Sequence, residues 1–287
     1  MLYCLIITAV YVLLIALLVA GVLMLSFPKN RHEQSQGEYV SVVVAFRNEA
    51  ENIQNLIDAL NHQTLPPTRW EAIFVDDGSS DSSADAVKRA GWNIRYVKLN
   101  GRTGKKQAII KGVSVARYNI VALTDADCIP AATWLQGVLA NIGGRALVQG
   151  SVNVVPNKSV VSHFEALDYA SLMAASAGSF ALGGPIIASA SNMAFRKNLI
   201  EVSAKTLKAR YASGDDMFLL HEAKRLLLPT GFIASNLADV TTHFDGGFLQ
   251  MVQRRKRWAS KANGYTDLQT IVAAIVVLLM NLLIVVK

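Results

Sequence analysis

Two aspartates in the middle of the chain have the type and spacing of metal ligands. Residues 120–124 are apolar or β-prone and lead directly into Asp125 and Asp127. This pattern predicts a buried strand that ends at the surface, where ligands bind in open α/β sheets. Carboxylate oxygens at that edge suit Mg²⁺ or Mn²⁺. Aspartate is also common in solvated turns, so the pair needs partners from elsewhere in the chain before it indicates a site.

Three further polar groups are candidates for such partners. Asp76 and Asp77 close an apolar segment, and one of them could accept hydrogen bonds from a nucleobase or ribose, although an Asx turn with a helix cap explains them too. Gly104–Lys105 opens a predicted helix and could hold a pyrophosphate, but a basic turn of this kind is more often solvated. Asp215 and Asp216 form an acidic pair suited to general-base work or to an N-cap.

A basic and aromatic run lies near the end of the chain. Arg254–Arg257 could neutralise a leaving diphosphate, and Trp258 could stack on a sugar or a lipid headgroup. Interfacial tryptophan and positive-inside arginines next to a membrane span would produce the same run without catalysis. His243 could be a metal ligand or a general base, whereas a lone histidine is more often structural.

The elements that would position these residues alternate between strand and helix. Apolar patterning predicts strands over residues 39–46, 70–75, 94–99 and 120–124 and helices over 50–63, 82–90 and 105–117. Such alternation predicts an α/β fold with a parallel sheet and helices on both faces. Beyond Asp127 we predict helices over 131–142, 159–180 and 217–226 and strands over 147–155, 186–195 and 231–235. The 159–180 helix suits a membrane surface and a protein core equally well.

The two ends of the chain are unusually apolar. The chain has 287 residues, 52% of them hydrophobic, and residues 2–27 and 268–286 are uncharged runs of about the length that spans a bilayer. Because Lys29 and Arg31 follow the first run and the basic run precedes the second, the positive-inside rule predicts that the intervening residues are cytoplasmic. The chain ends one residue after the second run, which leaves open whether further spans follow.

The charge distribution also bears on partners. The formal net charge of +7 lies largely beside the two apolar runs, which favours membrane lipids over nucleic acid as the partner. Cys4 and Cys128 are the two cysteines, and we expect no disulfide between them in a reducing cytoplasm. We therefore expect a multi-pass protein of the cell membrane, the inner membrane in a bacterium, with its catalytic domain in the cytoplasm.

Taken in order, the motifs resemble those of the family 2 glycosyltransferases, of the GT-A fold, and especially of their membrane-bound members. Residues 42–49 (VVVAFRNE) resemble the first strand and nucleotide-binding turn, and residues 74–81 (FVDDGSSD) resemble the V-D-D-G-S-x-D motif. Thr124–Asp127 is similar to the D-x-D motif, Asp215–Asp216 to the E-D pair, and Arg254–Trp258 to (Q/R)-x-x-R-W. The resemblance covers residues 39–262.

The resemblance implies a role for each candidate residue. The nucleotide-sugar donor would be bound by residues of the first strand, the following loops and the D-x-D motif: Ala45, Arg47, Glu49, Asp77, Lys105 and Asp125. Asp127 would bind Mg²⁺ or Mn²⁺, with His243 as a candidate second ligand. Asp216 would be the base, and Arg254, Arg257 and Trp258 would close over donor and acceptor. Two departures are Asp215 in place of glutamate and Arg254 in place of the commoner glutamine.

The expected function is inverting, metal-dependent transfer of a sugar from a UDP- or GDP-sugar to the hydroxyl of a lipid-linked or membrane-proximal acceptor, either a lipid or a glycan. One alternative is a processive polysaccharide synthase, which would need several more spans. Another is a catalytically inactive sugar-nucleotide-binding membrane protein. A nucleotidyltransferase would place a glycine-rich loop where Arg47–Glu49 stands.

Overall fold

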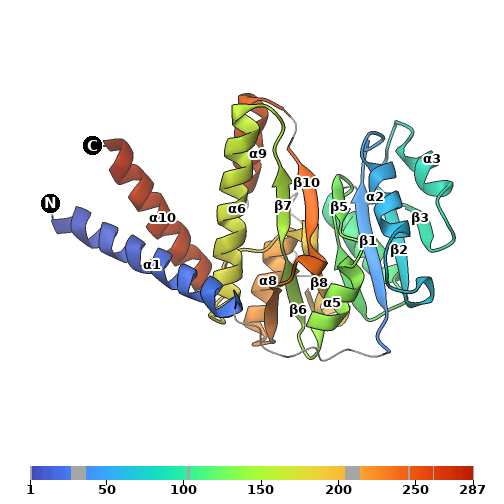
Figure 1. Cartoon of the computed structure of the whole chain (residues 1–287), viewed down its shortest axis with the longest axis horizontal. Helices are drawn as coiled ribbons and strands as arrows, with labels where there is room; N and C mark the ends of the chain where they lie inside the picture. Colours follow the sequence, from blue (N-terminus) through green and yellow to red (C-terminus); the bar gives the residue numbers. More distant parts are fainter. Residues whose placement is uncertain are drawn as a thin grey trace.

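A computed structural model describes residues 2–26, 37–101, 104–203, 214–244, 246–260 and 262–286. A central sheet of seven strands lies between two layers of helices, and two long terminal helices leave the molecule together on one side (Figure 1). The predicted α/β architecture is therefore confirmed. The predicted site residues all belong to the described part of the chain, whereas Lys29 and Arg31 lie outside it.

The central sheet has the order β3-β2-β1-β4-β8-β6-β9. Its first four strands are parallel, as predicted, and β8 runs antiparallel between β4 and β6. The strands are β1 (Val40–Phe46), β2 (Trp70–Asp76), β3 (Ile94–Lys98), β4 (Ile120–Leu123), β6 (Leu147–Gly150), β8 (Met193–Arg196) and β9 (Thr230–Ile233). The β-branched residues of β1 are buried on both faces of the sheet, which explains why this strand shows no polar alternation.

A second sheet of three strands has the order β5-β10-β7, with β5 (Cys128–Pro130), β7 (Val152–Val155) and β10 (Val240–His243). The residues predicted as one strand over 147–155 form two strands, β6 and β7, because the chain changes sheets at Ser151. Asn192 donates a hydrogen bond to the carbonyl of Ser151 at 2.7 Å, and a Cβ at Gly150 would overlap the Asn192 side chain. The predicted strand over 186–195 begins only at Met193, since a 3₁₀ turn (η2, Ala190–Asn192) precedes β8.

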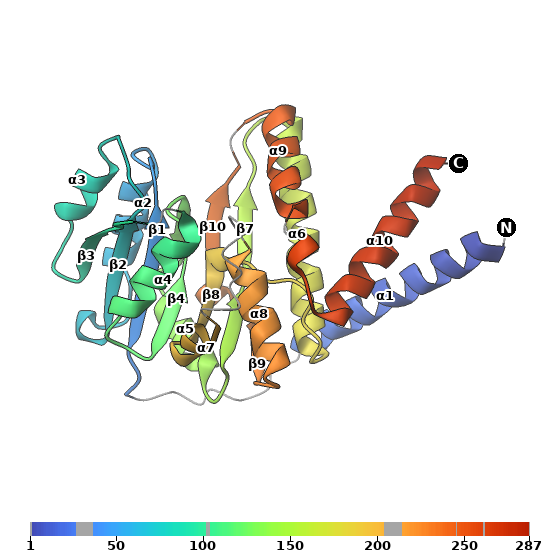
Figure 2. The same ribbon diagram turned by 180° about the vertical axis from the view of Figure 1, so that it is seen from behind.

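Helices cover both faces of the central sheet, as expected. One face packs against α2 (Ile53–Asn61), α3 (Ser83–Lys88) and α5 (Trp134–Ile142), and the other against α4 (Lys105–Val115), α7 (Asn198–Ser203) and α8 (Asp215–Arg225). Figure 2 shows α4 and α8 side by side on the second face. Short 3₁₀ turns connect some elements: η1 (Pro67–Arg69), η3 (Asn236–Ala238) and η4 (Ala262–Gly264).

The remaining helices form the side of the molecule from which the termini project. They are α1 (Leu2–Ser26), α6 (Val160–Ala181), α9 (Phe248–Ala259) and α10 (Leu268–Val286). Two of them, α1 and α10, are long and apolar enough to cross a membrane, and only 6% of each apolar stretch is buried. The close approach of α1 to α6 requires glycine, because a Cβ at Gly21 or Gly178 would overlap the backbone of the facing helix.

Candidate functional site

The predicted donor-binding residues meet at the carboxyl edge of the parallel strands. In the register of β1 and β2, Phe46 lies opposite Asp76, so that the loops beginning at Arg47 and Asp77 start side by side. The neighbouring strand β4 ends at Leu123, two residues before Asp125. Ala45, Lys105 and Asp125 line the same narrow crevice at this edge. The sequence motifs are therefore brought together as expected.

Asp76 and Asp77 are adjacent but have different surroundings. Asp76 accepts hydrogen bonds from the Ser79 amide at 2.7 Å and from the Tyr96 hydroxyl at 2.9 Å, which is the Asx-turn role. Burial and this hydrogen bond raise the pKa of Tyr96 to about 12. Asp77 instead accepts a hydrogen bond from the Gly104 amide at 2.7 Å and so holds the start of α4 against the end of β2.

Asp125 is held from two sides. The Lys105 ammonium lies 2.5 Å from its Oδ1, and the Ser191 hydroxyl donates to its Oδ2 at 2.7 Å. Burial by itself would lower the pKa of Lys105, but the carboxylate of Asp125 outweighs it and raises the pKa. Ser191 was not predicted as a site residue, because no spacing pattern in the sequence links it to a motif 66 residues earlier.

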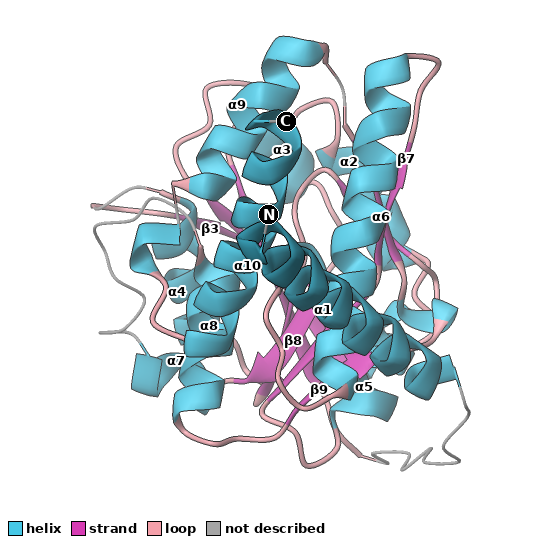
Figure 3. Ribbon diagram, turned by 90° about the vertical axis from the view of Figure 1, so that its left-hand side faces the viewer, coloured by secondary structure: helices cyan, strands magenta, loops and turns pink. Residues whose placement is uncertain are grey.

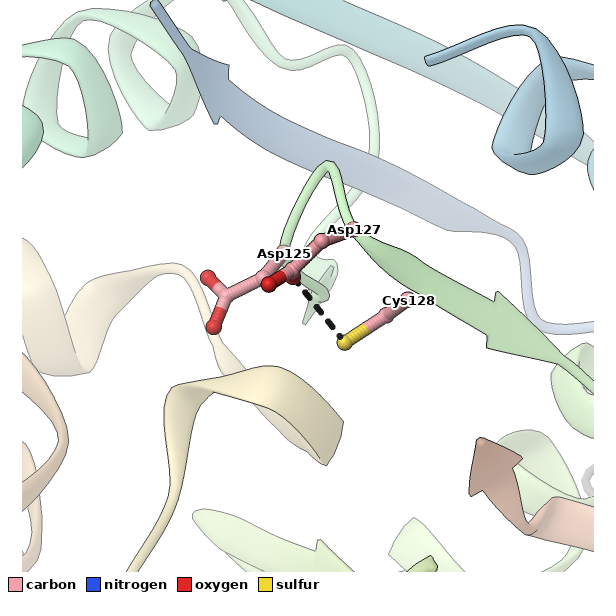
Figure 4. Close-up of side chains that lie close together, drawn as sticks. All are labelled: Asp125, Asp127 and Cys128. Atoms are coloured by element: carbon pink, nitrogen blue, oxygen red, sulfur yellow. Dashed lines mark hydrogen bonds between the residues drawn. The ribbon is translucent and has the colours of Figure 1, made fainter. Parts of the chain in front are cut away.

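The residues at the carboxyl end of β4 fit a hard divalent cation. Asp125, Asp127 and Cys128 each have a ligand atom within 4.8 Å of the others. In Figure 4 the Cys128 thiol points toward Asp127, to which it donates a hydrogen bond at 3.6 Å, while Asp125 extends from the other side of the turn. Burial and the two carboxylates raise the pKa of the thiol, so it stays protonated. The available donors are therefore carboxylate oxygens, which Mg²⁺ and Mn²⁺ prefer.

A third carboxylate faces the same cluster. Glu49 follows β1, and its amide donates to the Ser83 hydroxyl at 2.8 Å. Burial raises the pKa of Glu49. A hydrogen bond from Asn52 has the opposite effect, but the charges of Asp127 and Asp125 raise the pKa further. Exclusion of solvent and the charge of Asp125 likewise raise the pKa of Asp127. Such mutual repulsion between acids would be relieved by a bound cation.

The second acidic pair occupies the first turn of α8, and the predicted N-cap role is wrong because Gly214, with a φ of 100°, is the N-cap. The positive end of the helix dipole stabilises carboxylates in this turn. Asp215 is buried and lies 3.8 Å from the Lys106 ammonium. Asp216 is partly exposed, and its charge is close enough to act on Lys105, Tyr169 and Tyr265. Lys105, Asp125 and Asp216 thus lie around one electrostatically coupled cleft.

Tyr169 and its partners were not anticipated from the sequence. This buried tyrosine of α6 shares a hydrogen bond of 3.1 Å with Ser189, and burial together with the charge of Asp125 raises its pKa. The Ser189 amide in turn donates to Gln149 of β6 at 2.9 Å. Helix α6 therefore reaches the central sheet beside the acidic cluster, a contact that only the folded chain creates.

The basic and aromatic run lies on α9. Arg254 is 2.5 Å from Glu165 of α6 and stacks on Phe244, so this arginine, which we expected among the catalytic residues that close over donor and acceptor, is engaged in joining two helices. Arg257 is exposed, whereas Trp258 packs on Tyr169 with 6.1 Å between ring centroids. His243 ends β10, one residue past Thr242, which pairs with Cys128, but it does not belong to the cluster of cation ligands among the described residues.

Several glycosyltransferases are similar to this chain over part of their length. The chain is 33% identical over 119 residues to glycosyltransferase AglE of Haloferax volcanii, covering 40% of this chain and 39% of AglE. It is 31% identical over 104 residues to dodecaprenyl-phosphate galacturonate synthase of Rhizobium johnstonii, covering 34% of this chain and 31% of that protein. It is 26% identical over 163 residues to poly-β-1,6-N-acetyl-D-glucosamine synthase of Staphylococcus epidermidis, covering 55% of this chain and 39% of that protein. The chain thus spans less than two fifths of each of these relatives.

Solved structures share the fold. A mannosyltransferase of Pyrobaculum calidifontis, solved with GDP-mannose and Mn²⁺, superposes with a TM-score of 0.60 at 19% identity, covering 96% of this chain and 81% of that one. S. aureus TarS superposes with a TM-score of 0.57 at 17% identity, covering 83% and 69%. These likenesses establish the GT-A fold that the motifs implied.

The family assignment rests on the sequence itself. The model of glycosyl transferase family 2 matches residues 41–201, more than half of the 287 residues. This segment runs from β1 to α7 and includes the D-x-D turn and the serines that surround it. The chain therefore belongs to glycosyl transferase family 2.

Proposed function

We propose that the chain transfers a sugar, with inversion, from a UDP- or GDP-sugar to the hydroxyl of a lipid-linked or membrane-proximal acceptor in the presence of Mg²⁺ or Mn²⁺. The observation that carries this proposal is the single cleft that gathers Asp77, Lys105, Asp125, Asp127 and Asp216 from four parts of the chain. Paired acids beside a lysine suit a donor with two phosphates, because both cations and carboxylates are needed to hold and release it.

The donor would lie along the carboxyl edge of β1, β2 and β4. We assign the nucleoside to Asp77 and to the turn from Ala45 to Glu49, and the diphosphate to Lys105. The ammonium of Lys105 is already oriented by Asp125, so little reorganisation is needed when a phosphate arrives. We assign Asp125 to the sugar and ribose, with Ser191 fixing the direction of its carboxylate.

Asp127 would hold the cation. A bound Mg²⁺ or Mn²⁺ would act as a Lewis acid for the departing diphosphate. Supporting this assignment, the carboxylate of Asp127 lies near two other carboxylates, those of Glu49 and Asp125. His243 remains a proposed second ligand, since its strand pairs with the residues directly after Asp127.

Asp216 would be the general base. Its carboxylate would take the proton of the acceptor hydroxyl as the oxygen attacks the anomeric carbon, and the bond to the diphosphate would break on the opposite face. A single displacement of this kind inverts the anomeric configuration and needs no enzyme nucleophile. Arg257 and Trp258 would border the acceptor side, with Arg254 holding their helix to α6.

A lipid-linked acceptor is supported by two features. The name of one relative, dodecaprenyl-phosphate galacturonate synthase, specifies a polyprenyl acceptor, and another relative is a 4,4'-diaponeurosporenoate glycosyltransferase. The two apolar helices, α1 and α10, would anchor the chain in the same membrane as such an acceptor. We propose a multi-pass arrangement with the catalytic domain on the cytoplasmic side, where nucleotide sugars are available.

The test is transfer by an Asp216→Asn variant to a hydroxyl acceptor in the presence of Mn²⁺. We expect a loss of about 10²- to 10⁴-fold in kcat with nearly unchanged donor affinity, which is the usual size of a general-base contribution. Asp85→Asn is the matched control, because Asp85 is exposed on α3 away from the cleft. Equal transfer by Asp216→Asn and wild type would remove Asp216 as the base. Donor binding by the wild type without any turnover would instead favour an inactive sugar-nucleotide-binding protein.

The second candidate function is processive synthesis of a polysaccharide. It is favoured by the 26% identity to poly-β-1,6-N-acetyl-D-glucosamine synthase over 163 residues. Mass spectrometry of the products distinguishes the two candidates. A single added sugar on each acceptor supports the first, and a ladder of lengths at low enzyme concentration supports the second.

A further inference from the structure

Large apolar side chains are exposed along one surface formed by α6 and α9. On α6, Val160 and Leu167 are 84% and 72% exposed, with Phe164 between them. At the start of α9, Phe248 and Leu249 are also exposed, at 67% and 65%. We call these five residues the α6–α9 apolar surface. An exposed cluster of this kind marks a binding surface rather than ordinary protein exterior.

The apolar face of α6 continues into the contact with the terminal helix α1. Val160, Phe164, Leu167 and Ala174 are spaced four, three and seven residues apart, so they share one face of the helix. Four residues further along the same face is Gly178, where the backbone of α1 packs at Leu18 and Gly21. The candidate membrane span and the exposed residues therefore occupy one continuous side of α6.

The same surface faces the side from which the termini project. In Figure 3, which views the molecule from that side, α1 and α10 are in front, with α6 to the right of α10 and α9 to its upper left. A bilayer that holds α1 and α10 would therefore adjoin the outer faces of α6 and α9. The opposite face of α6 carries the buried residues Glu165, Tyr169 and Met173, which face the interior.

The charges around this surface are mainly positive. The acids Glu165 and Asp168 of α6 are paired with Arg254 and Arg255 of α9. Three additional exposed cations belong to the same two segments: Lys158, which precedes α6, and Lys256 and Arg257 of α9. Arg255 also lies 5.7 Å from the ring centre of Phe164, so one cation lies directly over the apolar residues. Apolar residues and cations on the same helices match the boundary between acyl chains and anionic headgroups.

We propose that the α6–α9 apolar surface lies in the headgroup region of the bilayer and binds anionic lipid, so that α6 runs along the membrane. The proposal rests on the membrane anchoring that is part of the proposed function. It would place Tyr169, on the inner face of α6, between the bilayer and the acidic cleft. An acceptor with a lipid tail could then reach Asp216 without leaving the membrane.

The test measures the depth of single fluorescent probes in the full chain reconstituted into bilayers. In a Cys4→Ser background, which leaves the buried Cys128, the environment-sensitive fluorophore NBD is attached at Leu167→Cys or Val160→Cys. The matched control is Trp92→Cys, which is 80% exposed but lies beside β3, far from α6 along the sheet. Each labelled protein is placed in bilayers of phosphatidylcholine with or without phosphatidylglycerol, and then exposed to doxyl-labelled lipid or aqueous iodide.

We expect doxyl lipid to remove most of the emission at positions 160 and 167 and little at position 92, with iodide acting in the opposite order. Replacing both Lys256 and Arg257 by glutamine should reduce the quenching at 167 most in bilayers with phosphatidylglycerol. Iodide quenching at 167 equal to that at 92 would overturn the proposal. So would disulfide cross-links between two Leu167→Cys chains, which would identify a second copy as the occupant. Neither readout needs sugar transfer, so failure here is distinct from failure of the proposed reaction.

Discussion

Two lysine–aspartate pairs begin at neighbouring positions of α4 and differ in almost every respect. The Lys105 ammonium lies 2.5 Å from Asp125 at the crevice beside β4, and these side chains are 41% and 27% exposed, so we call this the exposed pair. The Lys106 ammonium lies 3.8 Å from Asp215, and each of these side chains is 5% exposed. Successive helix residues point about 100° apart, so α4 contributes one lysine to the cleft and the other to the interior.

The difference in exposure suits one pair to donor binding and the other to stabilising the fold. An exposed ion pair contributes little to stability, because water competes with both partners, and it can exchange one partner for an incoming phosphate. A buried pair lacks that freedom, and removal of one partner leaves an uncompensated charge. Lys106 also lies 4.9 Å from the ring centre of Phe218, which fixes it against α8. We infer that Lys105 serves the donor, while Lys106 holds the turn that carries Asp216.

Breaking the buried pair should have the largest effect. We expect Lys106→Met to lower the free energy of unfolding by about 3 kcal/mol, because the buried Asp215 carboxylate would lose the ammonium of Lys106. Urea unfolding in detergent, followed by tryptophan fluorescence, measures the change.

A double variant, Lys106→Met with Asp215→Leu, is the control for this prediction. Replacing both partners removes both buried charges, so most of the lost stability should return. Transfer should not recover in parallel, because the turn before Asp216 would lack its electrostatic anchor. If Lys106→Met alone unfolds at the wild-type urea concentration, the pair does not support α8 as inferred.

Removing the Lys105 ammonium from the exposed pair should leave the stability of the fold nearly unchanged and weaken donor binding. For Lys105→Met we expect a change of less than about 1 kcal/mol in unfolding free energy. Loss of a charge-assisted hydrogen bond to phosphate costs about 1.5–3 kcal/mol, which corresponds to a rise in the donor Kd of about tenfold or more. Isothermal titration with UDP- and GDP-sugars and Mn²⁺ measures it. Lys111→Met, exposed on the same helix, is the matched control, and equal donor affinities of the two variants would refute the assignment.

The residues of the exposed pair were predictable, because local patterns carry them. Lys105 follows a glycine at a helix start, and Asp125 follows an apolar strand, so both the elements and the sheet edge could be read from the sequence. The same patterns gave the four parallel strands β1–β4 and the two apolar terminal helices.

The buried pair and the later half of the fold were not predictable in the same way. Nothing in the spacing joins Lys106 to a carboxylate 109 positions later, and the contact exists only because α4 and α8 cover the same face of the sheet. Strands β5 and β10 and helix α9 were missed, since the two strands are too short for a clear alternation. Ser191 lies in a 3₁₀ turn inside what had the composition of one long strand, and its role depends on tertiary contacts.

A third lysine–aspartate pair tests the comparison at its smallest expected effect. Lys224 of α8 lies 2.6 Å from Asp267, each side chain is 14% exposed, and Asp267 also accepts a hydrogen bond from the Thr270 amide at the start of α10. Burial opposes the charge of Asp267, but these partners outweigh burial and lower its pKa below the ordinary 3.8.

The resulting stability is fully present above the unfolded-state pKa and is lost as the pH falls through the lower folded-state value. Asp267→Asn should therefore cost about 1 kcal/mol at neutral pH and flatten the loss of stability below pH 4. Urea unfolding at several pH values tests this, and parallel curves for variant and wild type would place Asp267 with the exposed pair instead.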